Sequence, residues 1–129
     1  MTTFKHTALV CNSEENADKF YQALLGLKKA EPRILPRSLS NAIFGVEADL
    51  TIINYTGSSM HFEIFIVSGT SNSAPRIEHT CIEVKSRSKL LEDCGNLNIT
   101  VNQVPKGDKT LLFVQDFDGN LFEVKTGSD

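Results

Sequence analysis

Apolar and polar positions alternate along residues 4–11, which predicts a strand. His6 lies on the same face of this strand as the residues two positions before and after it. In the following segment, residues 12–27, apolar residues recur every three or four positions, which is typical of an amphipathic helix. Asn12 or Ser13 can cap the start of this helix, and Gly26 can end it. The chain therefore opens with a strand followed by a helix.

Short apolar runs bounded by turn residues follow up to Gly69, and they predict a series of strands. The predicted strands are residues 27–35 (interrupted by Pro32), 41–46, 50–55 and 60–67. Residues 68–75 are small and polar, which favours a linker at this point.

The same order of patterns then begins again. A strand is predicted at residues 77–84, a helix at 86–94, and strands at 97–104, 109–116 and 120–124. A shift of 73 residues (79 minus 6) places His6 on His79 and Leu24 on Leu97, so histidine matches histidine and apolar matches apolar. The sequence indicates a duplicated βαβββ unit, with module one at about residues 1–69 and module two at about residues 75–129.

The composition and charge of the chain limit the classes of molecule that it is expected to bind. The 129 residues include 16 acidic and 13 basic side chains and contain no basic stripe, which argues against nucleic acid. No apolar stretch approaches the roughly 20 residues that cross a bilayer. The first residues lack a secretory signal pattern, and three cysteines form no paired framework, so a cytoplasmic location is expected. A small molecule is the expected partner.

The repeat places a histidine on the first strand and a glutamate on the last strand of each module. The set is His6, Glu63, His79 and Glu123. If the modules pair about a pseudo-twofold axis, two imidazoles and two carboxylates meet, and such ligands suit a divalent ion such as Ni, Co, Mn, Fe or Zn. His61 shares the strand face of Glu63 and is left open as an alternative ligand.

The chain resembles the vicinal oxygen chelate superfamily, which includes glyoxalase I, methylmalonyl-CoA epimerase, extradiol dioxygenases and bleomycin-resistance proteins. Residues 5–27 (KHTALVCNSEENADKFYQALLGL) are similar to its opening strand and helix. Residues 111–124 (LLFVQDFDGNLFEV) are similar to its closing motif, with Phe117 where that motif usually has proline. The resemblance implies one α+β domain over residues 1–129, in which two βαβββ modules form a curved mixed β-sheet with helices on the outside. It also implies a homodimer and a metal held by His6, Glu63, His79 and Glu123.

The function implied is that of a divalent-metal-dependent lyase or isomerase. In this family the metal commonly stabilises an enediolate or enolate while a ligand glutamate moves a proton next to a carbonyl. Glu123 is the first candidate for this base and Glu63 the second, because a positioned carboxylate can transfer a proton. Arg76 lies near the place where the family uses an arginine, which implies an anionic substrate. The alternatives are a metal-free small-molecule binding protein of the bleomycin-resistance type, and an iron-dependent ring-cleaving dioxygenase.

Overall fold

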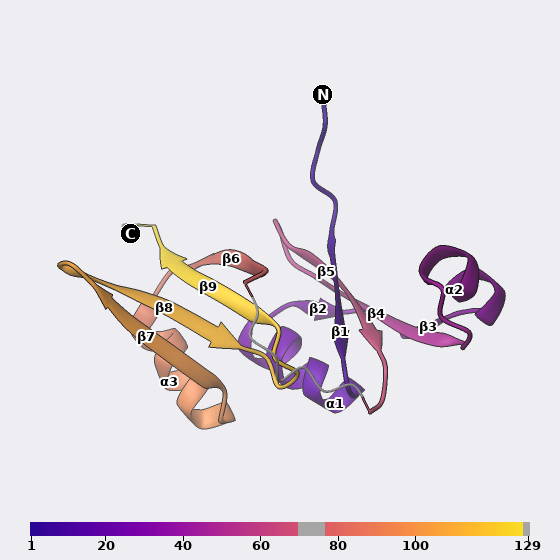
Figure 1. The fold of residues 1–129 in the computed structure, drawn as a ribbon. Coiled ribbons are helices and arrows are strands. Elements are labelled where there is room, and N and C mark those ends of the chain that lie inside the picture. Colours follow the sequence, from indigo (N-terminus) through magenta and orange to yellow (C-terminus); the bar gives the residue numbers. More distant parts are fainter. Residues whose placement is uncertain (70–76, 128–129) are drawn as a thin grey trace. The chain divides into compact units, whose positions relative to one another are not determined.

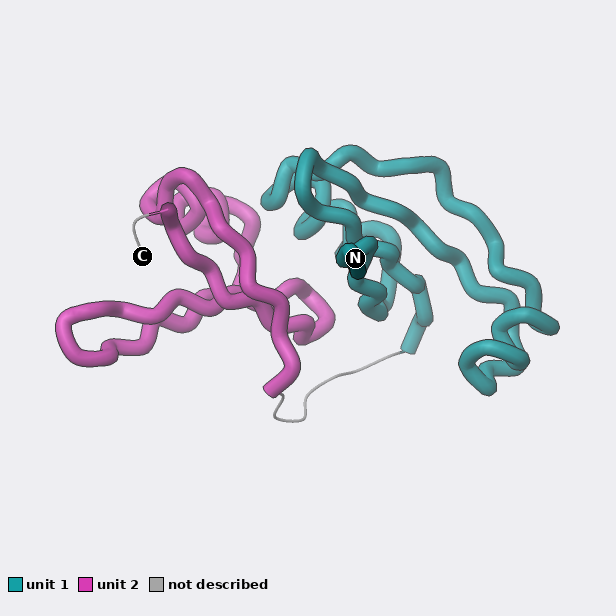
Figure 2. Tube along the Cα trace, turned by 90° about the horizontal axis from the view of Figure 1, so that it is seen from above, with its two compact units in different colours: residues 1–70 teal, residues 71–129 magenta. Residues whose placement is uncertain are grey.

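The computed structural model describes residues 1–69 and 77–127. These residues form two compact units, which span residues 1–70 and 71–129 of the chain (Figure 2). Each unit is built on its own mixed sheet, one of five strands and one of four (Figure 1). The predicted α+β class and the repeated module are therefore confirmed. Among the described residues, no helix has both the length and the apolar character needed to cross a membrane.

Unit 1 begins with the predicted strand and helix. Its elements are β1 (Thr7–Cys11), α1 (Glu14–Ala17), η1 (Asp18–Leu24), β2 (Lys28–Lys29), β3 (Arg33–Leu35), α2 (Arg37–Phe44), β4 (Leu50–Thr56) and β5 (His61–Ile66). The side chain of Ser13 accepts a hydrogen bond from the backbone N–H of Asn16, which caps α1 as predicted. Gly26 follows the π-helical segment η1 with a φ of 70°, a conformation that glycine adopts without strain.

The strand order in unit 1 is β1-β5-β4-β2, and β3 also pairs with β4. β1 and β5 run parallel, whereas the other pairs are antiparallel. One face of this sheet is buried against the first helical segment. The ring of Tyr21, from η1, lies 5.6 Å from that of Tyr55 and 5.4 Å from that of Phe62. Glu63 and its alternate neighbours on β5 therefore point to the opposite face.

The predicted strand at residues 41–46 is wrong, because most of this segment lies in helix α2. Leu39 and Ile43 are four residues apart on this helix, and Gly45 ends it with a φ of 72°. The ring of Phe44 packs edge-on against Phe65 at 5.4 Å, so the helix is anchored on the sheet face that carries Glu63. A short apolar run fits either a strand or a buried helical turn, and here tertiary packing decides in favour of the helix. Figure 1 shows α2 at the end of the unit, next to β3.

Unit 2 repeats the plan with fewer elements. They are β6 (His79–Val84), α3 (Arg87–Leu97), β7 (Thr100–Lys106), β8 (Lys109–Gln115) and β9 (Leu121–Thr126), with the strand order β6-β9-β8-β7. β6 and β9 are parallel, as β1 and β5 are in unit 1. The side chain of Ser86 accepts a hydrogen bond from the N–H of Lys89 at the start of α3, and Asn98 ends the helix in the left-handed conformation. Buried residues such as Leu112, Phe122 and Leu90 form the core of this unit.

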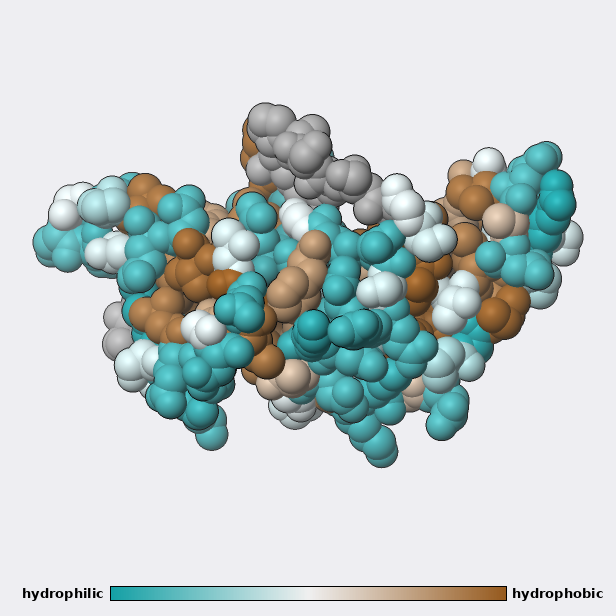
Figure 3. Space-filling view, turned by 90° about the horizontal axis from the view of Figure 1, so that it is seen from below, coloured by the Kyte–Doolittle hydropathy of each residue, from teal (hydrophilic) through white to brown (hydrophobic). Residues whose placement is uncertain are grey.

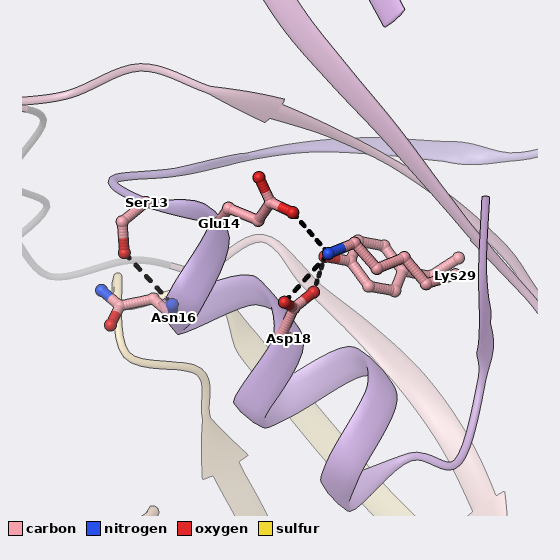
Figure 4. A network of polar contacts seen from close by, with 6 residues as sticks. Ser13, Glu14, Asn16, Asp18 and Lys29 are labelled. Carbon is pink, nitrogen blue, oxygen red and sulfur yellow. Dashed lines mark hydrogen bonds and ion pairs between the residues drawn. The ribbon is translucent and has the colours of Figure 1, made fainter. Parts of the chain in front are cut away.

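A polar network holds the first helical segment to the sheet of unit 1 (Figure 4). Lys29, from β2, forms ion pairs with Glu14 and with Asp18. The hydroxyl of Tyr55, from β4, donates a hydrogen bond of 2.7 Å to the other carboxylate oxygen of Asp18. Burial, followed by this hydrogen bond to Asp18, raises the pKa of Tyr55 far above its ordinary value. The network fixes the helix on the face of the sheet opposite to Glu63.

Candidate functional site

In unit 1, the structure brings together the first predicted histidine and glutamate. His6 directly precedes β1, and Glu63 lies on the neighbouring parallel strand β5. The Nε2 atom of His6 is 3.9 Å from Oε1 of Glu63. The Glu63 side chain is 17 % exposed, so it is shielded from solvent but remains open on one side.

Two further polar side chains of unit 1 approach this pair. Arg33, from β3, places Nη2 at 3.2 Å from the second carboxylate oxygen of Glu63. His61 lies with its ring centroid 5.4 Å from that of His6, and its Nε2 is 2.6 Å from the side-chain oxygen of Asn54. The amide oxygen of Asn54 only accepts hydrogen bonds, so Nε2 of His61 carries the proton and Nδ1 is the nitrogen of His61 that could act as a ligand.

In unit 2, the second predicted pair is also in contact. Nε2 of His79, on β6, is 3.4 Å from Oε1 of Glu123, on β9. Lys125, two residues further along β9, has its Nζ 3.6 Å from the other oxygen of Glu123. The Glu123 side chain is 21 % exposed, close to the value for Glu63. Each glutamate thus lies between a histidine and a cationic side chain of its own unit.

The other ring nitrogen of His79 determines the orientation of this imidazole. Nδ1 is 2.8 Å from the carbonyl oxygen of Ile77, and because a carbonyl only accepts hydrogen bonds, Nδ1 carries the proton. In the neutral ring, Nε2 then presents its lone pair to Glu123. A histidine that donates through one nitrogen to a backbone carbonyl and uses the other as a ligand is common at metal sites.

The two pairs occupy equivalent positions in their sheets. Glu63 is in register with Ala8, and Glu123 is in register with Cys81. In each case the histidine lies two residues before the residue opposite the glutamate, on the same face of the sheet. The histidines are 73 residues apart (79 minus 6) and the glutamates 60 (123 minus 63), yet the two units repeat the same side-chain geometry.

The donor chemistry of each pair fits a divalent cation. In His79, whose Nδ1 carries the proton, Nε2 and the carboxylate oxygen both accept hydrogen bonds, so a proton or a cation between them stabilises their approach. Nitrogen and oxygen ligands about 2.0–2.2 Å from an ion are roughly 3.0–3.4 Å from each other at angles near 90–109°. The distance in the His79 pair is 3.4 Å and that in the His6 pair is 3.9 Å. The His79 pair is thus at the upper end of that range, and a small side-chain rotation would bring the His6 pair into it.

Cys81 lies opposite Glu123 on the same sheet face. Burial, followed by the nearby charge of Glu123, raises the pKa of its thiol above the ordinary value. The neutral thiol of this exposed residue is therefore favoured in the metal-free chain.

Arg76 lies outside the described residues. The joining of the two pairs into one site with four ligands stays a prediction, as do the individual roles of the four residues. Sequence reasoning missed the pairing of Lys125 with Glu123, although the alternation of side chains on β9 places both on one face. It missed the contact of Arg33 with Glu63 because that contact depends on the long-range pairing of β3 with β4.

Comparison with known proteins gives the fold a name. No protein-family model matches the sequence, and no curated protein sequence matches it. Among solved structures, the chain is similar to a glyoxalase family protein from Enterococcus faecalis, with 18 % identity, a TM-score of 0.71 and coverage of 95 % of each chain. The chain has the vicinal oxygen chelate fold.

Two other solved structures with this fold carry information on ligands. One is a mutant of the fosfomycin resistance protein FosX from Listeria monocytogenes in complex with Mn(II) and 1S,2S-dihydroxypropylphosphonic acid. Its identity to this chain is 15 % and its TM-score is 0.71, with coverage of 97 % of this chain and 90 % of FosX. The other is the trypanothione-dependent glyoxalase I of Leishmania major, with 22 % identity and a TM-score of 0.68 over 95 % of this chain and 85 % of the enzyme.

Proposed function

We propose that this protein is a divalent-metal-dependent lyase or isomerase that moves a proton next to a carbonyl in a small anionic substrate. The observation that carries the proposal is the pair of equivalent contacts, His6 with Glu63 and His79 with Glu123. A fold shared with Mn(II)-bound FosX and with a glyoxalase I supports it further.

In this proposal His6, Glu63, His79 and Glu123 together hold the ion. Two imidazoles and two carboxylates suit Ni, Co, Mn, Fe or Zn without a strong choice among them. When bound, the ion would supply a Lewis acid that stabilises negative charge on a substrate oxygen. The carbonyl oxygen of Ile77 keeps the His79 ring oriented for this role.

Glu123 is the first candidate for the residue that moves the proton, and Glu63 is the second. Glu63 is held by Arg33 at 3.2 Å, whereas Glu123 is held by Lys125 at the longer distance of 3.6 Å. A lysine is a flexible point charge, and a guanidinium is a more rigid partner of carboxylates. The looser pairing makes Glu123 the carboxylate that can more easily turn toward a substrate proton.

The first test is the divalent metal content per chain in protein purified without added metal and without a histidine tag. We expect near-stoichiometric metal in the wild type and a marked loss in His79→Ala. Glu83→Gln is a matched control, because Glu83 shares the sheet face of His79 and belongs to neither pair. Absence of metal after reloading would overturn the proposal.

The role of Glu123 is tested by exchange of substrate protons with heavy water. Candidate substrates are small carbonyl compounds that carry a carboxylate or phosphate. Exchange that needs metal and disappears in Glu123→Gln with metal still bound supports Glu123 as the base. Exchange that survives in that variant and disappears in Glu63→Gln assigns the role to Glu63.

A second candidate function is a metal-free binding protein of the bleomycin-resistance type. The ion pairs of Arg33 with Glu63 and of Lys125 with Glu123 favour it, because both carboxylates then have a cationic partner without a metal. Tight binding of a small molecule that persists in chelator and in His79→Ala would support this function over the first.

We also propose a cytoplasmic homodimer. The described cysteines Cys11, Cys81 and Cys94 are all free thiols, which suits a reducing compartment. Exposed apolar residues gather on β3 and α2 and just beyond the helix, and they are Ile34, Leu39, Ile43, Phe44 and Val46. Figure 3 shows apolar surface at the right-hand end of the molecule, where α2 lies. An apolar patch of this kind is typical of a protein–protein contact, and a second copy is the partner we expect.

A further inference from the structure

A small hollow opens in unit 2 where strands β8 and β9 diverge. β8 pairs with β7 from Lys109 onward, but its pairing with β9 begins only at Leu112, opposite Val124. The start of β8, which pairs with β7 but not with β9, and the end of β9 border an open space of about 240 Å³. Glu123, the first candidate for the base, contributes to its wall.

The charged side chains of this hollow come from three elements. Arg87 lies at the start of α3, Lys109 at the start of β8 and Lys125 near the end of β9. The carboxylate among the lining residues is that of Glu123, whose Oε2 is 3.6 Å from Nζ of Lys125. Among the described residues that line the hollow, three are cationic and one is a carboxylate, and such a lining favours anions where solvent is partly excluded.

Arg87 is held in place at the wall. Its Nη1 donates a hydrogen bond of 2.8 Å to the backbone carbonyl of Thr110, which also lines the hollow. A guanidinium carries five N–H donors in a planar fork, so one such group can hold several acceptors at once, a ligand anion among them. Ordering the group before a ligand arrives lowers the entropy lost on binding.

We propose that this hollow binds the anionic group of a ligand, a carboxylate or a phosphate, through Arg87, Lys109 and Lys125. Its volume is below the roughly 300–1,000 Å³ of sites that enclose a whole drug-sized ligand, so it fits one charged group while the remainder extends along the open sheet face. The contact with Glu123 places that remainder beside the candidate base. The assignment of the anion to a substrate rests on the proposed function, but the binding of the anion does not.

The test is a titration of the full chain, treated with chelator, followed by the amide signals of Thr110 and Lys125 in NMR spectra. One series uses inorganic phosphate and the other uses acetate. The variants are Lys109→Gln, Arg87→Gln and Lys125→Gln. Lys106→Gln is the matched control, because Lys106 lies opposite Lys109 in the register of β7 and β8 but does not line the hollow. Well-dispersed spectra of each variant establish that it is folded.

We expect saturable binding in the wild type and in Lys106→Gln. In each of the other three variants the affinity should fall to about one tenth or less, because each loses a charge-assisted contact. Saturation by phosphate alone identifies a phosphate-binding hollow, and saturation by acetate identifies a carboxylate-binding one. Either result supports the proposal. Absence of saturable binding, or an equal loss in Lys106→Gln, overturns it. Because metal has been removed, the result is independent of whether the protein is a metalloenzyme.

Discussion

The Nε2 atom of His79 lies 3.4 Å from Oε1 of Glu123, on the diagonal between two parallel strands. The same diagonal joins His6 to Glu63 in the other unit at 3.9 Å. Both contacts follow from the same strand register. In each unit, the residue opposite the glutamate comes two positions after the histidine. Duplication of the parallel strand pair thus duplicates the contact between histidine and glutamate.

The first prediction separates the proposed ligands from their neighbours. We expect His79→Ala to weaken binding of Ni(II) or Co(II) by more than about 100-fold, since even the loss of an outer hydrogen-bonding partner typically costs 10–100-fold. His61→Ala should have a much smaller effect, because the contacts of His61 with the described residues are to His6 and Asn54 and not to a glutamate. The measurement is a competition titration against a chelator of known affinity. An equal loss in both variants would make His61 a ligand.

The second prediction concerns Arg33, which competes with a metal for Glu63. Replacing Arg33 by glutamine should raise metal affinity by up to about fivefold, because a partly exposed ion pair typically contributes about 0–1 kcal/mol. The matched control is Arg37→Gln, since Arg37 forms an exposed ion pair with Glu47 at 3.6 Å. A fall in metal affinity in Arg33→Gln would mean that the guanidinium orients Glu63 as a ligand instead of competing for it.

The third prediction tests the apolar patch around α2. Ile43 is 60 % exposed, and if a second copy covers it, Ile43→Ser should weaken dimerisation by about tenfold or more. Ile77→Ser is the control, because Ile77 is 88 % exposed and belongs to unit 2. Light scattering during size-exclusion chromatography gives the mass as a function of concentration. A wild-type mass equal to one chain at every concentration would contradict the proposed dimer.

The sequence was most informative where a feature depends on local periodicity. Alternation along β5 and β9 places Glu63 and Glu123 on the face opposite the buried core, because side chains in a strand alternate whatever its partners are. The predicted strand at residues 41–46 failed for a non-local reason, since its helical form depends on the packing of Phe44 against Phe65. The contact of Arg33 with Glu63 could likewise not be predicted from the sequence, because it requires the pairing of β3 with β4.

The last prediction concerns the hydrogen bond between Tyr55 and Asp18. Tyr55→Phe should lower the free energy of unfolding by about 1–2 kcal/mol at neutral pH, because it removes a buried bond to a carboxylate. The difference between the two proteins should also depend on pH. Burial and the Asp18 carboxylate raise the pKa of Tyr55 above its ordinary value of 10.0, so the folded state retains a proton that the unfolded state releases.

The stability that Tyr55 contributes is therefore fully present below pH 10.0 and declines as the pH rises further, by about 1.4 kcal/mol for each unit. Urea unfolding of wild type and Tyr55→Phe between pH 7 and pH 11 measures this difference, and groups common to both proteins cancel from it. A difference that stays constant across pH 10–11 would mean that the Tyr55 hydroxyl ionises as readily in the folded chain as in the unfolded one. In that case neither burial nor the bond to Asp18 would favour the protonated hydroxyl in the folded chain.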